Sequence, residues 1–239
     1  MRVGVVWFRN DLRLHDHRPL VRALAECDAV VPLFVWDPRI WSRDPVTGLE
    51  RLGPHRARFW REAVDDLRSG LEAVGAELWT AVGRPPDAVP RVAERVRADS
   101  VYFQGAVADE EVRDEAAVAW ALEQDGRSVC SEAGTTLVEP EGLPFPLAEL
   151  PDVFTEFRRA VERDFRVAEP LSAPARVPGA PGDVSRQEPD WAALALDVME
   201  PDARAVLPMR GGERAGLARL EAYVFEADAL RHYKATRNG

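Results

Sequence analysis

Runs of consecutive apolar residues alternate with longer amphipathic segments over residues 1–132. The apolar runs are rich in β-branched residues and do not alternate with polar positions, which is typical of strands covered by helices on both faces. We expect strands at 3–8, 29–36, 77–82, 100–103 and 128–130. We expect helices at 19–27, 54–74, 86–98 and 110–124. This order predicts an α/β fold, a Rossmann-like doubly wound five-stranded parallel sheet.

The character of the chain changes after residue 133. Frequent prolines between 166 and 210 exclude a long helix or a central strand there. We therefore expect an α/β domain at 1–133, a Pro-rich connector at 134–210 with one helix near 152–165, and a third segment at 211–239. In that segment a single amphipathic C-terminal helix is expected to begin at Gly212, with one apolar side: Leu217, Leu220, Val224 and Leu230.

Charge and composition narrow the classes of function. The chain has 239 residues, and 31 Lys and Arg against 41 Asp and Glu give a net charge of −10. This charge argues against an electropositive surface that follows a nucleic acid along the whole chain. No apolar run approaches the roughly 20 residues of a membrane helix, and no leader precedes the first strand. We expect a cytoplasmic protein with no membrane partner.

Polar residues follow three of the expected strands, where open parallel sheets bind ligands. These loops are Arg9–Arg13, Asp37–Arg39 and Gln104–Ala106. None contains a glycine-rich dinucleotide or phosphate-binding motif. Their charges could tie the first loop to the next domain or hold the loop to itself. His15 and His17 flank Asp16, a pattern that more often makes helix-cap and surface contacts than a metal site, so no metal is expected.

Four motifs in this order resemble a known family. They are VWFRNDLRLHDH at 6–17, LPF at 143–145 with ELPDVFTEFR at 149–158, RGGERAGLARL at 210–220 and HYKATRNG at 232–239. The first resembles the opening of the DNA photolyase/cryptochrome family, and the others resemble its cryptochrome-DASH branch. The resemblance spans the whole chain and about the first half of what the family has.

This resemblance implies a light-driven flavoprotein. Its N-terminal α/β domain can hold an antenna chromophore, a folate or a deazaflavin, and a helical domain holds FAD and receives a flipped pyrimidine dimer. Excited reduced flavin donates an electron that splits the cyclobutane ring, preferentially in single-stranded DNA, and some members signal blue light instead. The cofactor carries this chemistry, while the protein supplies position and electrostatics.

The resemblance also implies what this chain lacks. Of the family's FAD contacts only Tyr233 has a matching position, and the rest of the helical domain would lie beyond Gly239. The chain is therefore expected to be a truncated N-terminal portion that binds no FAD, is not catalytically competent by itself, and would reach damaged DNA only through the missing domain. The apolar side of its last helix is expected to dock imperfectly or to self-associate with a second copy.

An antenna pocket is implied near the ends of the strands. Its expected residues are Arg9, Asp11, Val35, Asp37, Gln104 and Ala106. Ala106 stands where many relatives carry an acidic residue that bonds the antenna ring, and losing such a bond weakens binding about ten- to a hundredfold. Weak antenna binding is the expectation. The alternative function is a free-standing Rossmann-like module that binds a nucleotide, a pterin or a partner protein.

Overall fold

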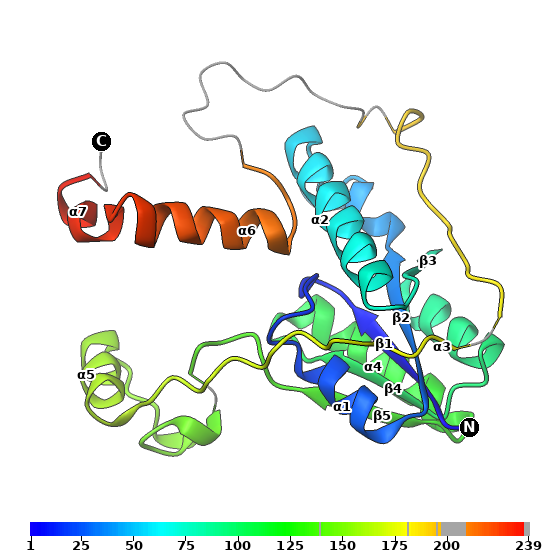
Figure 1. Ribbon diagram of the computed structural model, residues 1–239, viewed down its shortest axis with the longest axis horizontal. Helices are drawn as coiled ribbons and strands as arrows, with labels where there is room; N and C mark the ends of the chain where they lie inside the picture. The colour runs from blue at the N-terminus through cyan, green and yellow to red at the C-terminus, as the bar shows by residue number, and fades with distance from the viewer. Residues whose placement is uncertain (139, 181, 195, 197–208, 237–239) are drawn as a thin grey trace.

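The α/β part of the protein is a five-stranded parallel sheet with helices on both faces (Figure 1). The computed structural model describes residues 1–138, 140–180, 182–194, 196 and 209–236. The strands are β1 (Val3–Phe8), β2 (Ala29–Trp36), β3 (Trp79–Val82), β4 (Ser100–Gln104) and β5 (Ser128–Glu132). The main helices are α1 (Arg18–Glu26), α2 (Pro54–Ala73), α3 (Pro85–Arg95), α4 (Asp109–Gln124) and α5 (Phe154–Asp164). The predicted fold class is confirmed.

The strand order β3-β2-β1-β4-β5 makes the sheet doubly wound. The chain moves outward from β1 through β2 to β3, and then returns to place β4 on the other side of β1. Every strand pair is parallel, and β1 pairs with β2 along its full length, from Val3 opposite Ala29 to Phe8 opposite Phe34. The switch in winding direction therefore lies between β1 and β4, where ligands bind in folds of this kind.

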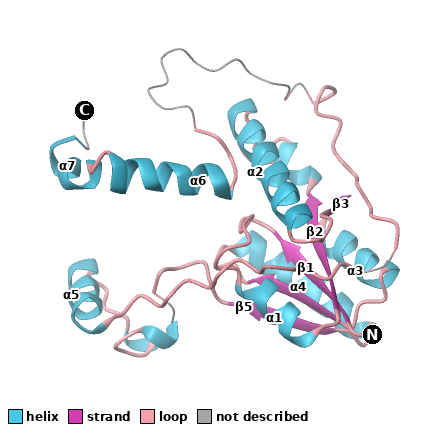
Figure 2. Ribbon diagram, viewed as in Figure 1, coloured by secondary structure: helices cyan, strands magenta, loops and turns pink. Residues whose placement is uncertain are grey.

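Helices flank the sheet (Figure 2), and two hydrophobic layers bury its two faces. Val6 and Phe8 of β1 pack with residues of α1 and α2 on one face. Val5 and Trp7 of the same strand pack with residues of α3 and α4 on the other face. Successive side chains of β1 thus enter opposite layers, and both layers are apolar, which explains why the strand sequences do not alternate with polar residues.

The proline-rich connector covers part of the sheet edge beside β2 and β3. Val30 donates its N–H to the carbonyl of Pro178, at 2.8 Å, and Thr80 donates to the carbonyl of Ser185, at 2.8 Å. Val177 is fully buried, and Trp191 packs edge to face on Trp36 with the ring centroids 5.0 Å apart. These connector residues therefore complete the first hydrophobic layer, although they follow β5 by more than 40 residues in the sequence.

The C-terminal segment corrects the expectation of a single helix. It consists of α6 (Glu213–Leu220), a π-helical stretch η4 (Glu221–Glu226) and α7 (Ala229–Thr236). Asp228 separates the last two with a φ of 47°, a left-handed conformation that ends the helical path. Leu230 therefore does not continue the apolar side of Leu217 and Leu220. Among the described residues, no helix has the length and apolar character that crossing a membrane needs.

Two glycines bring the start of α6 against α2. A Cβ at Gly211 would lie 1.9 Å from the carbonyl oxygen of Phe59, and Gly212 has a φ of 108°. The N–H of Gly211 donates to Glu62 at 2.8 Å, and Arg214 pairs with Asp66. Because a side chain has no room at position 211, the sequence of this turn fixes where α6 leaves the α/β body.

Gly211→Ala is expected to displace the start of α6 from α2, because the new Cβ overlaps the Phe59 carbonyl. Forcing an extra methyl group into a closed contact costs about 1–3 kcal/mol. Limited proteolysis should cut the variant faster within 209–220, and its thermal unfolding should begin at a lower temperature.

Gly216→Ala is the matched control, because nothing lies within 4 Å of its added Cβ. In a helix this change should be neutral or stabilise by about 0.5–1 kcal/mol. Equal proteolysis of the two variants would contradict the role given to Gly211.

Candidate functional site

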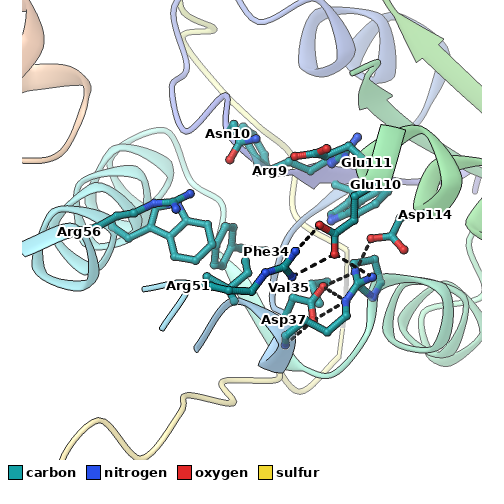
Figure 3. Close-up of a pocket in the computed structure, with 16 residues that line it drawn as sticks. Arg9, Asn10, Phe34, Val35, Asp37, Arg51, Arg56, Glu110, Glu111 and Asp114 are labelled. Carbon is teal, nitrogen blue, oxygen red and sulfur yellow. Dashed lines mark hydrogen bonds and ion pairs between the residues drawn. The ribbon is translucent and has the colours of Figure 1, made fainter. Parts of the chain in front are cut away.

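A cavity of about 420 Å³ opens at the carboxyl ends of β1 and β2, beside the first turns of α4. Its size is within the range of small-molecule sites in proteins. Aromatic rings and charged side chains line it together (Figure 3). The aromatic members are Trp7, Phe8, Phe34 and Trp60, and the charged members are Arg9, Asp37, Arg39, Arg51, Arg56, Glu110, Glu111 and Asp114.

Arg39 is the centre of an ion-pair network on one wall of the cavity. It lies two residues after Asp37, which directly follows β2 and caps the short helix η1 (Pro38–Trp41) by accepting the N–H of Arg39 at 2.9 Å. The guanidinium of Arg39 pairs with Asp37 and with Asp114 of α4. The hydrogen bond that the Arg39 guanidinium donates to Asp37 raises the pKa of Arg39 above its ordinary value, so this side chain stays cationic at every accessible pH.

A second pair, between Arg51 and Glu110, lies at the exposed side of the network. In Figure 3 the guanidinium of Arg51 points toward the Glu110 carboxylate, and their closest contact is 2.8 Å. The hydrogen bond from Arg51 lowers the pKa of Glu110 and raises that of Arg51. Glu110 also lies in the first turn of α4, where a negative charge is stabilised by the helix dipole.

The β1–α1 loop, residues 9–17, forms another wall and is held from within by Asp11. The Asp11 carboxylate accepts the N–H of Arg9 at 2.8 Å and the Nε2–H of His17 at 2.8 Å. His17 caps α1, because its Nδ1 accepts the N–H of Leu20 at 3.1 Å, which places the ring proton on Nε2. Asp11 is 3% exposed and His17 is fully buried.

Burial by itself raises the pKa of Asp11, but the hydrogen bonds from His17 and from the backbone of Arg9 outweigh burial and lower it. The carboxylate is therefore ionised in the folded protein near neutral pH. Arg9 leaves the loop to pair with Glu115 of α4, while Arg13 donates to the carbonyls of His15 and Asp16. The loop charges thus hold the loop to itself and also tie it to α4.

Only some of the site residues predicted from the sequence lie at this cavity. Arg9, Val35 and Asp37 line the cavity. Asp11 does not line it but holds one of its walls, the β1–α1 loop, by accepting the N–H of Arg9. The cavity lining does not include Gln104 or Ala106. Ala106 donates its N–H to Glu115 at 2.7 Å, and the Gln104 side chain lies against Gly134. The role of these residues in binding stays a prediction.

Sequence reasoning did not single out several residues of this cavity. Glu110 and Asp114 are one helical turn apart at the start of a helix that follows β4, which was the available signal for their placement. Arg51 precedes α2 and Arg56 lies in its first turn, and neither belongs to a recognisable motif. Only the folding of the chain brings them close to β2. Among the described residues, no group of three or more His, Cys, Asp or Glu side chains is arranged to hold a metal ion.

Comparisons with known proteins identify relatives along the whole chain. The sequence model of the DNA photolyase family matches residues 4–176. A cryptochrome DASH of Gloeobacter violaceus is 43% identical over 235 residues, covering 98% of this chain and 47% of that protein. A cryptochrome DASH of Natronomonas pharaonis is 41% identical over 239 residues, covering 100% of this chain and 50% of that protein.

A solved structure agrees with the sequence comparisons. The crystal structure of a Synechocystis cryptochrome superposes with a TM-score of 0.92 at 35% identity, over 100% of this chain and 49% of that one. The chain therefore spans about half the length of the curated relatives it matches.

Asp11→Asn is expected to lower the free energy of unfolding by about 1–3 kcal/mol at neutral pH, because a buried charged acceptor is lost. The pKa of Asp11 is lower in the folded than in the unfolded protein, so the carboxylate stabilises the fold above its unfolded pKa of about 3.9. That contribution is lost as the pH falls from there through the folded pKa.

Denaturant unfolding between pH 7 and pH 2 measures both parts of this prediction. The difference between the parent and Asp11→Asn should shrink toward acid pH. The exposed Asp183 supplies the control Asp183→Asn, which should follow the parent at all pH values. A pH-independent difference would show that the charge of Asp11 contributes nothing.

Proposed function

The chain belongs to the DNA photolyase family, and we propose from this membership that it supplies the α/β portion of a DASH-type cryptochrome or photolyase. The complete activity would be light-driven repair of cyclobutane pyrimidine dimers, preferentially in single-stranded DNA, or blue-light signalling. A flavin supplies that chemistry when bound. Flipping a lesion out of the base stack costs the least free energy when the DNA is already single-stranded. In this assignment the described residues hold and position the groups that take part in the reaction, and they do not carry out the reaction themselves.

The exposed apolar side chains of α6, η4 and α7 are the observation that carries this proposal. Leu217, Leu220, Phe225, Leu230 and Tyr233 are all about half exposed or more. Figure 1 shows their segment projecting from the α/β body rather than lying on the sheet. An apolar surface of this kind marks an interaction site. We assign it to contact with a helical flavin domain and, in the isolated chain, to self-association.

We propose that the described residues do not by themselves form a flavin site. Tyr233, the one residue matching the family's FAD contacts, is 53% exposed on α7. It does not line the cavity at β1 and β2. A single exposed ring cannot offset the several kcal/mol that association costs. We therefore propose that FAD and damaged DNA bind only when the helical half is present.

The cavity at β1 and β2 does fit a planar antenna chromophore, a folate or a deazaflavin. Phe34 and Trp60 offer apolar faces, and Arg9 and Arg51 offer cationic donors for ring oxygens or an acidic tail. A bound antenna would absorb light and pass the excitation energy to the flavin. Ala106 does not line this cavity, but by the family match it stands at the position of the ring's acidic partner, so we propose that binding in this chain is weak.

The same cavity favours a second candidate function. A free-standing Rossmann-like module would bind a nucleotide or a pterin at this place without any helical half, or would bind a partner protein through the apolar side of α6. The two functions differ in their need for flavin, because only the first couples the α/β domain to light-driven chemistry.

We predict that the purified chain is colourless and does not repair dimers. Joining it to the remaining half of the 43% identical Gloeobacter protein should restore flavin absorbance and blue-light repair of thymine dimers in single-stranded DNA. A dark reaction is the control for repair. Stoichiometric FAD in the isolated chain would overturn the assignment of the flavin site. A hybrid that binds FAD without repairing dimers would leave signalling as the family activity.

Ala106→Glu is predicted to increase folate binding about ten- to a hundredfold, because it restores a carboxylate for the ring. Titration with 5,10-methenyltetrahydrofolate, followed by near-ultraviolet absorbance, measures this change. Val107→Glu adds the same charge at an 83% exposed neighbour and should leave the affinity unchanged. Equal affinities of the parent and Ala106→Glu would place the antenna ring away from position 106.

A further inference from the structure

A second cavity, of about 790 Å³, lies beside the first and shares a wall with it. Asn10, Arg56 and Trp60 line both cavities. The second cavity continues along the β1–α1 loop to the start of α6, where Glu213 and Leu217 line it. The loop therefore separates the candidate antenna cavity from the segment that carries the exposed apolar side chains.

Three distant segments hold this loop in place. Arg9, at its start, pairs with Glu115 of α4. Asp16, near its end, exchanges two hydrogen bonds with the backbone of Leu171 in the connector, at 2.7 and 3.1 Å. The third contact comes from Glu213 in the first turn of α6. Of the three, only the contact from Glu213 depends on where the C-terminal segment docks.

Glu213 binds the loop with both oxygens of its carboxylate. Oε2 accepts the N–H of Leu14 and Oε1 accepts the N–H of His15, each at 2.9 Å. The contact is partly buried, and charge-assisted bonds of this kind are about twice as strong as neutral ones. Gly211 and Gly212 bring Glu213 to the loop by allowing α6 to begin directly against α2.

Hydrogen bonds connect the Glu213 contact to the first cavity through the loop itself. Arg13 donates from its guanidinium to the carbonyls of His15 and Asp16, at 3.1 and 2.9 Å. The N–H of Arg13 donates to the carbonyl of Asp11 at 2.7 Å, and Asp11 in turn accepts the N–H of Arg9. These bonds form a continuous path from Leu14 and His15 to Arg9, whose guanidinium lies 4.7 Å from the centre of the Trp7 ring in the cavity wall.

We propose that Glu213 is a positioning residue that couples the docking of α6 to ligand binding in the cavity at β1 and β2. This proposal rests on the proposed function for its ligand, a folate or deazaflavin antenna. The docked carboxylate fixes the loop in the conformation that places Arg9 and Asn10 around the ligand. Coupling between two binding events is reciprocal, so a ligand in the cavity also tightens the docking of α6.

The experiment compares Glu213→Ala, which removes both acceptors, with Glu213→Gln, which keeps one. Glu221→Ala is the matched control, because Glu221 is an exposed carboxylate on the same C-terminal segment. Amide-resolved hydrogen exchange is measured first, without ligand. Glu213→Ala should speed exchange at Leu14 and His15 at least tenfold and severalfold at residues 9–13, Glu213→Gln should give a smaller effect, and Glu221→Ala should give none.

The second measurement is titration with 5,10-methenyltetrahydrofolate. The dissociation constant of Glu213→Ala should rise about five- to twentyfold, corresponding to one or two lost hydrogen bonds, and Glu213→Gln should recover part of the loss. In the parent chain, saturating folate should slow exchange within 213–220. Glu213→Gln keeps the test decisive if Glu213→Ala does not fold.

The outcomes separate this proposal from the proposed function. Faster exchange confined to Leu14 and His15, with residues 9–13 and the folate affinity unchanged, would overturn the positioning role. If the parent chain binds no folate or deazaflavin, the antenna function fails, and exchange at 9–13 decides the positioning role alone. Faster exchange there supports it, and unchanged exchange overturns it.

Discussion

The buried carboxylate of Asp11 is the interaction on which the geometry of the site depends. An ionised group at 3% exposure is tolerated only when hydrogen bonds replace its water, and here Arg9 and His17 provide them. His17 also caps α1, so its side chain connects the loop that follows the central strand to the start of the first helix. The loop between them becomes a fixed wall to which α4, the connector and α6 each attach.

The proline-rich connector illustrates how an irregular segment serves a sheet. A parallel sheet leaves unpaired N–H and C=O groups at its edge, which must be paired or covered. Pro178, Ser185 and Gln187 meet this need beside β2 and β3 with backbone hydrogen bonds, and Val177 and Trp191 add apolar contacts. Prolines suit such a path because they favour extended backbone and have no N–H that needs an acceptor. The connector thus contributes to the fold as well as linking its parts.

The sequence predicts the α/β elements well because burial on both faces gives each strand a strong, local signal. All expected strands and helices of 1–132 are found, with ends shifted by a few residues. Strand ends also mark the loops after β1 and β2 that line the cavity, whereas the binding role of the loop at 104–106 stays a prediction. Arg51 and Trp60 could not be predicted, because their approach to β2 depends on long-range packing of α2. The helix break at Asp228 could not be predicted either, because the apolar spacing of residues 217–230 alone fits one continuous helix.

Polar contacts orient the C-terminal segment, while its apolar side chains are exposed. Glu62, Asp66 and the two N–H groups bound by Glu213 fix the direction of α6 at its first turn. Such hydrogen bonds are directional but add only about 0.5–1.5 kcal/mol each, or somewhat more with a charged partner. Burial of Leu217, Leu220 and Phe225 would supply a larger, non-directional stabilisation of roughly 1.5–3 kcal/mol per side chain. Orientation and stabilisation therefore come from different groups. Under the proposed function, the α/β domain would set where a helical partner docks, and the partner would decide how tightly the segment is held.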